Sequence, residues 1–159
     1  MADETMPATE AQDEGGEIAT YECAFHILPT VADEEVPATF TALKERIERA
    51  GGTVKDEEEP QRFDLAYEVG KRVDGQMRRF NASYFGWVRF DAEPAVAASV
   101  NDEFGRSAEV LRHIVVRLTR EEIAHPFSVF AARAAEAAEA SDEEGAESAE
   151  SEEEKDATA

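Results

Sequence analysis

Three stretches of the chain decide the fold: RFDLAYEVGK at residues 62–71, FNASYFGWVRF at residues 80–90 and VLRHIVVR at residues 110–117. In the first two, apolar and polar side chains alternate, which predicts strands with one buried face. The alternating apolar positions of the first stretch are Phe63, Leu65, Tyr67 and Val69, and the buried face of the second is Phe80, Ala82, Tyr84, Gly86, Val88 and Phe90. Residues 70–79 include Gly70, Asp74 and Gly75 and predict a hairpin loop between the two strands.

The remaining elements complete a six-element order. Residues 21–27 alternate in the same way and predict a first strand, and residues 110–118 predict the last one. Apolar side chains every three or four residues predict a first helix with the stripe Val36, Phe40, Leu43, Ile47 and Ala50. Asp33 is a capping candidate for this helix, and Gly51-Gly52 ends it. The acidic run at residues 56–60, which follows the helix, predicts a bend or bulge. Pro94 opens a second helix, with the stripe Val96, Val100 and Phe104 and a stop at Gly105.

Strand, helix, strand, strand, helix, strand is the order of the ferredoxin-like βαββαβ arrangement, an α+β fold. We therefore expect a four-stranded antiparallel sheet with both helices on one face. The other face is then open or covered by a partner. The fold by itself does not give a function.

The negative charge of the chain lies mostly at its ends. Of the net charge of −21, residues 1–18 carry −6, residues 19–125 carry −6 and residues 126–159 carry −9. Residues 1–18, and the chain from Ser141 onward, contain almost no large apolar side chains, so they cannot bury enough surface to offset the entropy of ordering. We predict an acidic disordered extension at 1–18, a ferredoxin-like domain at 19–125 and an Ala/Glu-rich acidic tail at 126–159.

Several function classes find no support in the sequence. Cys23 is the single cysteine and is expected to be a small buried residue. The three histidines have no metal-ligand spacing, and no Gly-rich phosphate loop or nucleophile–base set is present. We therefore expect no enzyme, metal, cofactor or small-molecule substrate. Without a signal peptide or an apolar run of about 20 residues, we expect a cytoplasmic protein with no membrane partner.

The predicted hairpin loop is basic. Lys71, Arg72, Arg78 and Arg79 lie within nine residues and are opposed by Asp74 alone, so the loop carries a local charge of +3. Such a patch fits phosphate binding, because neutralised phosphates release counterions. An ordinary charged hairpin would show the same composition, so this alternative stays open.

The strand at 80–90 carries large aromatic side chains on its second face. Phe85 and Trp87 share that face with Arg89, which suggests a contact surface. The chain after residue 119 could instead cover these side chains. The run from Phe85 to Phe90 also resembles part of the RNP1 motif of RNA-recognition domains, although its usual Lys/Arg-Gly start is absent.

Taken in order, these motifs resemble the ribosomal protein S6 family of the bacterial small subunit. The resemblance covers about residues 19–125. It includes Tyr21-Glu22, Pro29-Thr30, Gly51-Gly52, Arg62 three residues before Leu65-Ala66-Tyr67, Val69-x-Lys71, Phe104, and Val110-Leu111-Arg112-x-Ile114-Val115-x-Arg117. Phe63 replaces the second member of the usual Arg-Arg pair, and Glu68 replaces a common proline. The acidic extension before the first strand is also unusual for the family.

The resemblance implies a non-enzymatic structural role in the small ribosomal subunit of the cytoplasm. It implies binding to the central domain of small-subunit ribosomal RNA together with ribosomal protein S18, with other small-subunit proteins nearby. The candidate RNA contacts are Arg62, Lys71, Arg72, Arg78, Arg79 and Arg89, and the candidate partner contacts are Phe85 and Trp87. Two alternatives stay open: an RNA-recognition-type domain that binds single-stranded RNA, and a ferredoxin-like dimeric interaction module.

Overall fold

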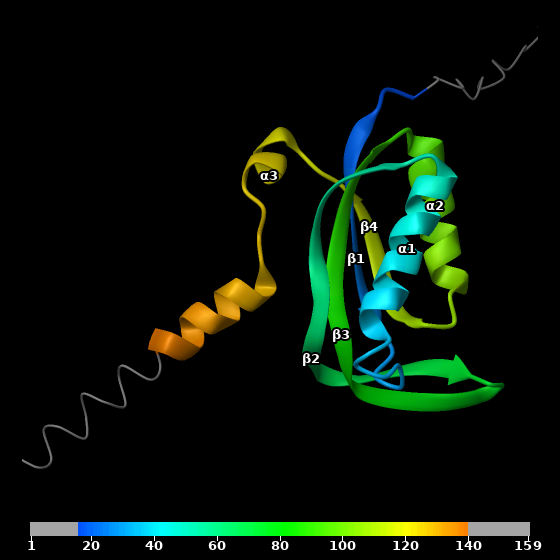
Figure 1. Ribbon diagram of the computed structural model, residues 1–159, viewed down its shortest axis with the longest axis vertical. Coiled ribbons are helices and arrows are strands. Elements are labelled where there is room, and N and C mark those ends of the chain that lie inside the picture. Colours follow the sequence, from blue (N-terminus) through cyan, green and yellow to red (C-terminus); the bar gives the residue numbers. More distant parts are fainter. Residues whose placement is uncertain (1–15, 140–159) are drawn as a thin grey trace, which may run out of the picture. The chain divides into compact units, whose positions relative to one another are not determined.

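The computed structural model describes residues 16–139, and Figure 1 shows their arrangement. The chain divides into two compact units, Met1–Ile123 and Ala124–Ala159, and each is described by itself. Disorder is predicted for residues 1–18 and for the chain from Ser141 onward. Apart from residues 16–18, these segments lie outside the described residues.

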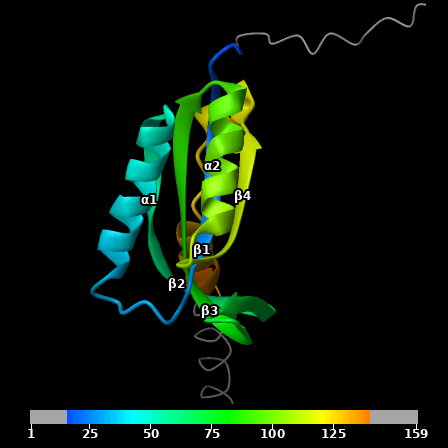
Figure 2. The same ribbon diagram turned by 90° about the vertical axis from the view of Figure 1, so that its right-hand side faces the viewer.

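The first unit contains one sheet and two covering helices, in the predicted order. The strands are β1 (Ala19–Ile27), β2 (Thr53–Val73), β3 (Gln76–Ala92) and β4 (Val110–Arg117). They pair antiparallel in the spatial order β2-β3-β1-β4. The helices α1 (Val36–Ala50) and α2 (Pro94–Arg106) lie side by side on one face of the sheet, as Figures 1 and 2 show. The ferredoxin-like prediction is confirmed.

The hydrophobic core lies between the sheet and the two helices. Phe25 of β1 is fully buried, and its ring lies 6.0 Å from that of Phe40 in α1 and 5.7 Å from that of Phe104 in α2. The predicted stripe of α1 is buried except for Ala50, which packs against the core from its rim. In α2 the buried stripe is Ala97, Val100 and Phe104, so Ala97 takes the place predicted for Val96.

The helix boundaries differ from the prediction by small steps. The N-cap of α1 is Glu35, which makes no side-chain capping hydrogen bond. Asp33, the predicted cap, accepts a hydrogen bond from the Tyr84 hydroxyl instead. Gly51 ends α1 with a φ of 111°, a left-handed conformation that glycine adopts readily. The helix α2 runs to Arg106, one residue beyond the predicted stop.

The predicted loop over residues 70–79 is wrong. The two strands stay paired to Val73 and Gln76, so only Asp74 and Gly75 form the turn. Both have positive φ angles, 51° and 78°, which is the signature of a two-residue type I′ hairpin turn. Glycine and aspartate tolerate this backbone, so the dipeptide itself explains the longer ladder.

The β2 strand changes register with β3 at three places. The first two lie between Val54 and Asp56 and between Glu58 and Gln61, in agreement with the predicted bulge in the acidic run. At the third, Asp64 pairs with Ala82 and the next pair is Val69 with Phe80. Residues 65–68 of β2 therefore face a single residue of β3, and the hairpin changes direction there.

Beyond that bulge, residues 69–80 form what we call the hairpin arm. The arm runs across the end of the sheet rather than along it (Figure 1). A second, small apolar cluster lies beneath it, formed by buried Leu28, Phe80 and Leu111 with Leu65, Val69 and Val73 at its edge. This cluster joins the arm to the ends of β1 and β4.

After β4, a short helix α3 (Arg120–Ala124) follows. In the second unit, residues 129–139 form a helix. Its side chains from 131 to 139 are exposed. Among residues 16–139, no helix combines the length and the apolar character needed to cross a bilayer.

Candidate nucleic-acid interface

The register of the hairpin arm separates its basic side chains onto two faces. Lys71 lies opposite Arg78, and residues directly opposite in a ladder share a face. Arg72 lies opposite Met77, and Arg79 lies opposite Gly70, so Arg72 and Arg79 occupy the second face. The predicted patch therefore consists of two pairs on a thin ribbon.

Lys71 is the partly buried member of this set. Its ammonium group donates hydrogen bonds to the backbone carbonyls of Ser107, at 2.7 Å, and of Val110. These carbonyls lie at the junction of α2 and β4, 36 and 39 residues farther along the chain. Burial lowers the pKa of Lys71 from its usual value. Lys71 therefore makes intramolecular contacts that sequence spacing does not reveal.

The arm's three arginines are exposed to solvent. Arg79 forms an exposed ion pair with Glu68 at 3.7 Å, and the Arg78 guanidinium lies 5.5 Å from the centre of the Phe80 ring. An exposed ion pair contributes at most about 1 kcal/mol, so a phosphate can displace it readily. Arg72, Arg78 and Arg79 are thus accessible to an anionic ligand from both faces of the arm.

Arg62 lies apart from the arm, on β2 opposite Tyr84. Tyr84 belongs to the helix-covered face, so Arg62 emerges at the edge of that face. The hydrogen bond to Asp33, together with burial, raises the pKa of Tyr84, and Arg62 nearby opposes the rise. The structure does not bring Arg62 into one cluster with the arm's arginines.

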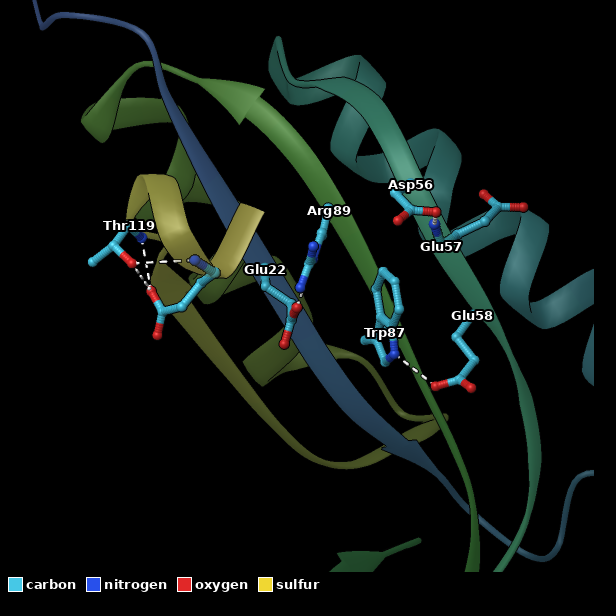
Figure 3. Close-up of polar contacts among 8 residues, drawn as sticks. Glu22, Asp56, Glu57, Glu58, Trp87, Arg89 and Thr119 are labelled. Atoms are coloured by element: carbon cyan, nitrogen blue, oxygen red, sulfur yellow. Dashed lines mark hydrogen bonds and ion pairs between the residues drawn. The ribbon is translucent and has the colours of Figure 1, made fainter. Parts of the chain in front are cut away.

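Arg89 and Trp87 lie on the sheet face opposite α1 and α2, as predicted, but both are buried. Ile123 of α3 lines the same hollow as Arg89 on this face. Trp87 is 6% exposed and donates from its indole nitrogen to Glu58 at 2.6 Å. Arg89 is 5% exposed, pairs with Glu22 at 2.8 Å, and lies 5.0 Å from the Trp87 ring centre. Figure 3 shows this run of contacts across β1, β3 and β2. These side chains stabilise the sheet by linking its strands.

Phe85 belongs to an aromatic group on the same face. Its ring lies 4.9 Å from the His26 ring and 5.6 Å from the Phe63 ring. The His26 Nδ1 is 2.7 Å from the Ser83 hydroxyl, and burial lowers the pKa of His26. Phe85 itself is half-buried, so part of this group reaches the surface.

A cavity of about 410 Å³ adjoins the aromatic group. Side chains from three strands line it, among them His26, Phe63, Leu65, Tyr67, Leu111 and Ile114. Sequence reasoning missed the contributions of His26, Phe63 and Ile114 to this face. One signal for this face was present in the last strand. Ile114 and Val116 are apolar residues on its second face, whereas a strand with one face in solvent has polar residues there.

The predicted RNA and partner residues stay predictions. The structure brings Lys71 and Arg78 together, and Arg72 with Arg79, but it places Arg62 and Arg89 elsewhere. Phe85 and Trp87 share a face, with Phe85 the more accessible of the two.

This arrangement defines a class of protein. Its prominent features are an exposed basic arm and an aromatic sheet face, both suited to contacts with macromolecules. Within residues 16–139, no group of three or more His, Cys, Asp or Glu side chains is placed to hold a metal ion. The class that the fold and these features define is a ferredoxin-like α+β domain with an exposed basic arm.

Comparison with known proteins gives the particular family. The model of the family described as ribosomal protein S6 matches residues 20–117, more than half of the chain. The chain therefore belongs to the ribosomal protein S6 family. It is a non-catalytic structural protein of the small ribosomal subunit, in the cytoplasm.

Three relatives illustrate the similarity. The small ribosomal subunit protein bS6 of Acidobacterium capsulatum is 28% identical over 102 residues, 64% of this chain and 67% of that protein. The protein of the same name from Koribacter versatilis is 28% identical over 103 residues, 65% of each chain. That of Clostridium perfringens is 30% identical over 97 residues, 61% of this chain and 94% of that protein. The matched region spans about two thirds of the first two proteins.

A solved structure supports the fold. The crystal structure of the 30S ribosomal protein S6 from Thermotoga maritima matches with a TM-score of 0.55 and 22% identity. The match covers 64% of this chain and 89% of the other.

Proposed function

We propose that this chain binds the central domain of small-subunit ribosomal RNA together with ribosomal protein S18, next to other small-subunit proteins. Membership of the ribosomal protein S6 family supports the proposal, and several relatives are named small ribosomal subunit proteins.

The observation that carries the RNA part is the hairpin arm. It holds Arg72, Arg78 and Arg79 exposed on a narrow ribbon that extends from an acidic chain. Screening limits the repulsion between distant carboxylates and RNA, because the Debye length is about 8 Å at physiological salt. A local basic arm can therefore bind phosphates even though the whole chain carries a net charge of −21.

The partner part rests on the sheet face opposite α1 and α2, in the region around Phe85. Phe85 and Phe63 contribute to an aromatic group there, and Ile114 is 58% exposed on the edge strand β4. Exposed apolar area next to an aromatic group is typical of a protein–protein contact. We assign this face to S18 and the arm to RNA.

A reversal of the arm's charge tests the RNA part. The variant carries Arg72→Glu, Arg78→Glu and Arg79→Glu, and its matched control carries Arg49→Glu, Arg117→Glu and Arg120→Glu at exposed positions away from the arm. Filter binding measures the affinity for a central-domain transcript in the presence of purified S18. We expect the arm variant to lose at least tenfold in affinity, and the control much less. Equal losses in both variants would show a general charge effect and overturn the assignment to the arm.

The partner face has its own test. Phe85→Ala removes the accessible aromatic ring and is expected to weaken S18 binding by roughly 1–2 kcal/mol, as measured by calorimetry without RNA. Met77→Ala is the control, because Met77 is an exposed apolar side chain on the arm. Unchanged S18 affinity in the Phe85 variant would remove this face from the proposal.

The RNA-recognition alternative receives little support from the geometry. It needs Phe85 and Trp87 to stack on bases, yet the Trp87 ring is buried against Arg89. The dimer alternative predicts self-association of the purified chain, which sedimentation equilibrium can measure directly.

A further inference from the structure

Lys71 differs from its basic neighbours in what it contacts. We infer that Lys71 is a positioning residue that fixes the direction of the hairpin arm, and that it does not itself contact RNA phosphate. The inference rests on the proposed RNA binding by the arm and assigns a separate role to one of the arm's basic residues.

The arm joins the rest of the sheet at a break in the ladder. Residues 65–68 lack a one-to-one ladder with β3, so continuous pairing does not fix the angle between the arm and the rest of the sheet. Contacts between the arm and its surroundings must therefore fix that angle. The apolar cluster under Phe80 provides one such contact, but apolar packing has little directionality.

Lys71 provides the directional contact. Its ammonium group donates to two carbonyls, those of Ser107 and Val110, from the inner side of the arm. Charge-assisted hydrogen bonds are stronger than neutral ones and depend on geometry. The opposing residue, Arg78, has the same charge, so the two carbonyl acceptors also offset the repulsion between these side chains.

The acceptor segment is itself held in place. The carbonyl of Glu109 accepts a hydrogen bond from the backbone N–H of Leu28 at 2.8 Å, which ties the segment to the end of β1. Arg46 of α1 donates to the Ser107 hydroxyl at 2.9 Å and pairs with Glu109 at 3.6 Å. Lys71 thus ties the arm to a segment that is already fixed to α1 and β1.

This placement has a consequence for RNA binding. An arm fixed before binding loses less conformational freedom when it meets RNA, so the arginines on it bind more tightly. Lys71 thereby raises the affinity through Arg72, Arg78 and Arg79, without adding a phosphate contact of its own. The partial burial of Lys71 and the lowered pKa of its side chain agree with an intramolecular role.

Three variants distinguish a basic side chain that fixes the direction of the arm from one that contacts RNA phosphate. Lys71→Met keeps the length of the side chain and removes its donors, whereas Lys71→Arg keeps both charge and donors. Arg72→Met is the matched control, because Arg72 is the exposed neighbour on the opposite face. Each is compared with the wild-type chain in hydrogen exchange of the free protein and in binding to a central-domain transcript with S18 across a salt series.

We expect Lys71→Met to speed amide exchange in the arm about tenfold or more, with β1 as an internal reference for intact folding. Its RNA affinity should fall about five- to tenfold at every salt concentration, with the slope of log K against log salt unchanged. Arg72→Met should leave exchange unchanged and reduce the slope by roughly 0.7–0.9, the loss of one phosphate contact. Lys71→Arg should keep both the amide exchange rate of the arm and the RNA affinity of the wild type.

Two results would overturn the inference. One is unchanged exchange of the arm in Lys71→Met, and the other is a slope reduced as much as in Arg72→Met, which would make Lys71 a phosphate contact. Failure of the wild-type chain to bind the transcript would overturn the proposed function instead. In that case faster exchange in Lys71→Met would still establish the tie between the arm and the α2–β4 junction.

Discussion

Arg89 and Glu22 form a largely buried ion pair across β3 and β1, on the sheet face opposite α1 and α2. The Nε of Arg89 lies 2.8 Å from a carboxylate oxygen of Glu22, and the two residues are directly opposite in the ladder. The Trp87 ring lies against Arg89 and donates to Glu58 on β2 (Figure 3). One run of polar contacts thus links three strands on a face where the sequence predicted an aromatic contact surface.

Removing one member of this pair should cost more than removing both. Glu22→Leu leaves the Arg89 charge buried without its partner, and we expect a loss of roughly 2–4 kcal/mol in the free energy of unfolding. The double variant Glu22→Leu/Arg89→Met should lie within about 1 kcal/mol of the wild type, because both charges are gone. Urea unfolding of the wild type, both single variants and the double variant measures the coupling. Additive losses would show that the pair does not act as a unit.

Gly86 is required by a close approach of the neighbouring strand. A Cβ atom at this position would lie 2.8 Å from the Glu58 carbonyl oxygen and 3.0 Å from the backbone nitrogen of Pro60. We expect Gly86→Ala to destabilise the fold by about 1–3 kcal/mol, because backbone atoms must move. Gly105→Ala is the control, since its Cβ would meet only His113 at 3.6 Å, and helix propensity predicts a gain of about 0.5–1 kcal/mol. Equal unfolding midpoints for the two variants would contradict this explanation of Gly86.

Cys23 should be inert in the folded protein. Its side chain is fully buried, and burial, with a smaller effect from Glu22, raises the pKa of its thiol to about 12. Since the thiolate is the reactive form, an aromatic disulfide reagent at pH 8 should label native protein only through unfolding. The expected result is no labelling over hours without denaturant and complete labelling within minutes in urea. Rapid labelling of the native protein would place Cys23 nearer the surface.

His26 should make stability depend on pH between about 7.5 and 5.5. Burial lowers its pKa in the folded state below the usual 6.5, so the unfolded chain takes up a proton first as the pH falls. The stabilising contribution is therefore present above about pH 6.5 and is lost as the pH falls below it. Urea midpoints at pH 7.5 and 5.5 should differ more for the wild type than for His26→Gln. The same difference in both proteins would mean that His26 does not contribute.

Much of the fold follows from local patterns in the sequence. The alternation around Phe25 and the stripe containing Phe40 each predict one buried face, and packing those faces together gives the core. The Asp74-Gly75 dipeptide is typical of a type I′ turn, but the loop predicted over residues 70–79 was too long, because the surrounding charges and Gly70 also suggested a loop. Local chemistry was sufficient for the core because each of its patterns acts within a few residues.

The candidate site depends on contacts between distant residues, which no local pattern contains. Lys71 finds its acceptors only because the bulge at 65–68 turns the arm across the end of the sheet. Arg89 meets Glu22, 67 residues away, only through the pairing of β1 with β3. Spacing alone groups Lys71 with Arg72, whereas the ladder places them on opposite faces of the arm.

The most direct test of the central claim is a sucrose-gradient profile of cell lysate at magnesium concentrations that keep ribosomes intact. It compares the wild-type chain with the variant Arg72→Glu/Arg78→Glu/Arg79→Glu. The wild type should appear at the small subunit and at the whole ribosome, and the variant should shift toward the top of the gradient, because its arm no longer attracts phosphate. A wild-type signal confined to the top would contradict the ribosomal role. Unchanged positions for the variant would contradict RNA binding through the arm.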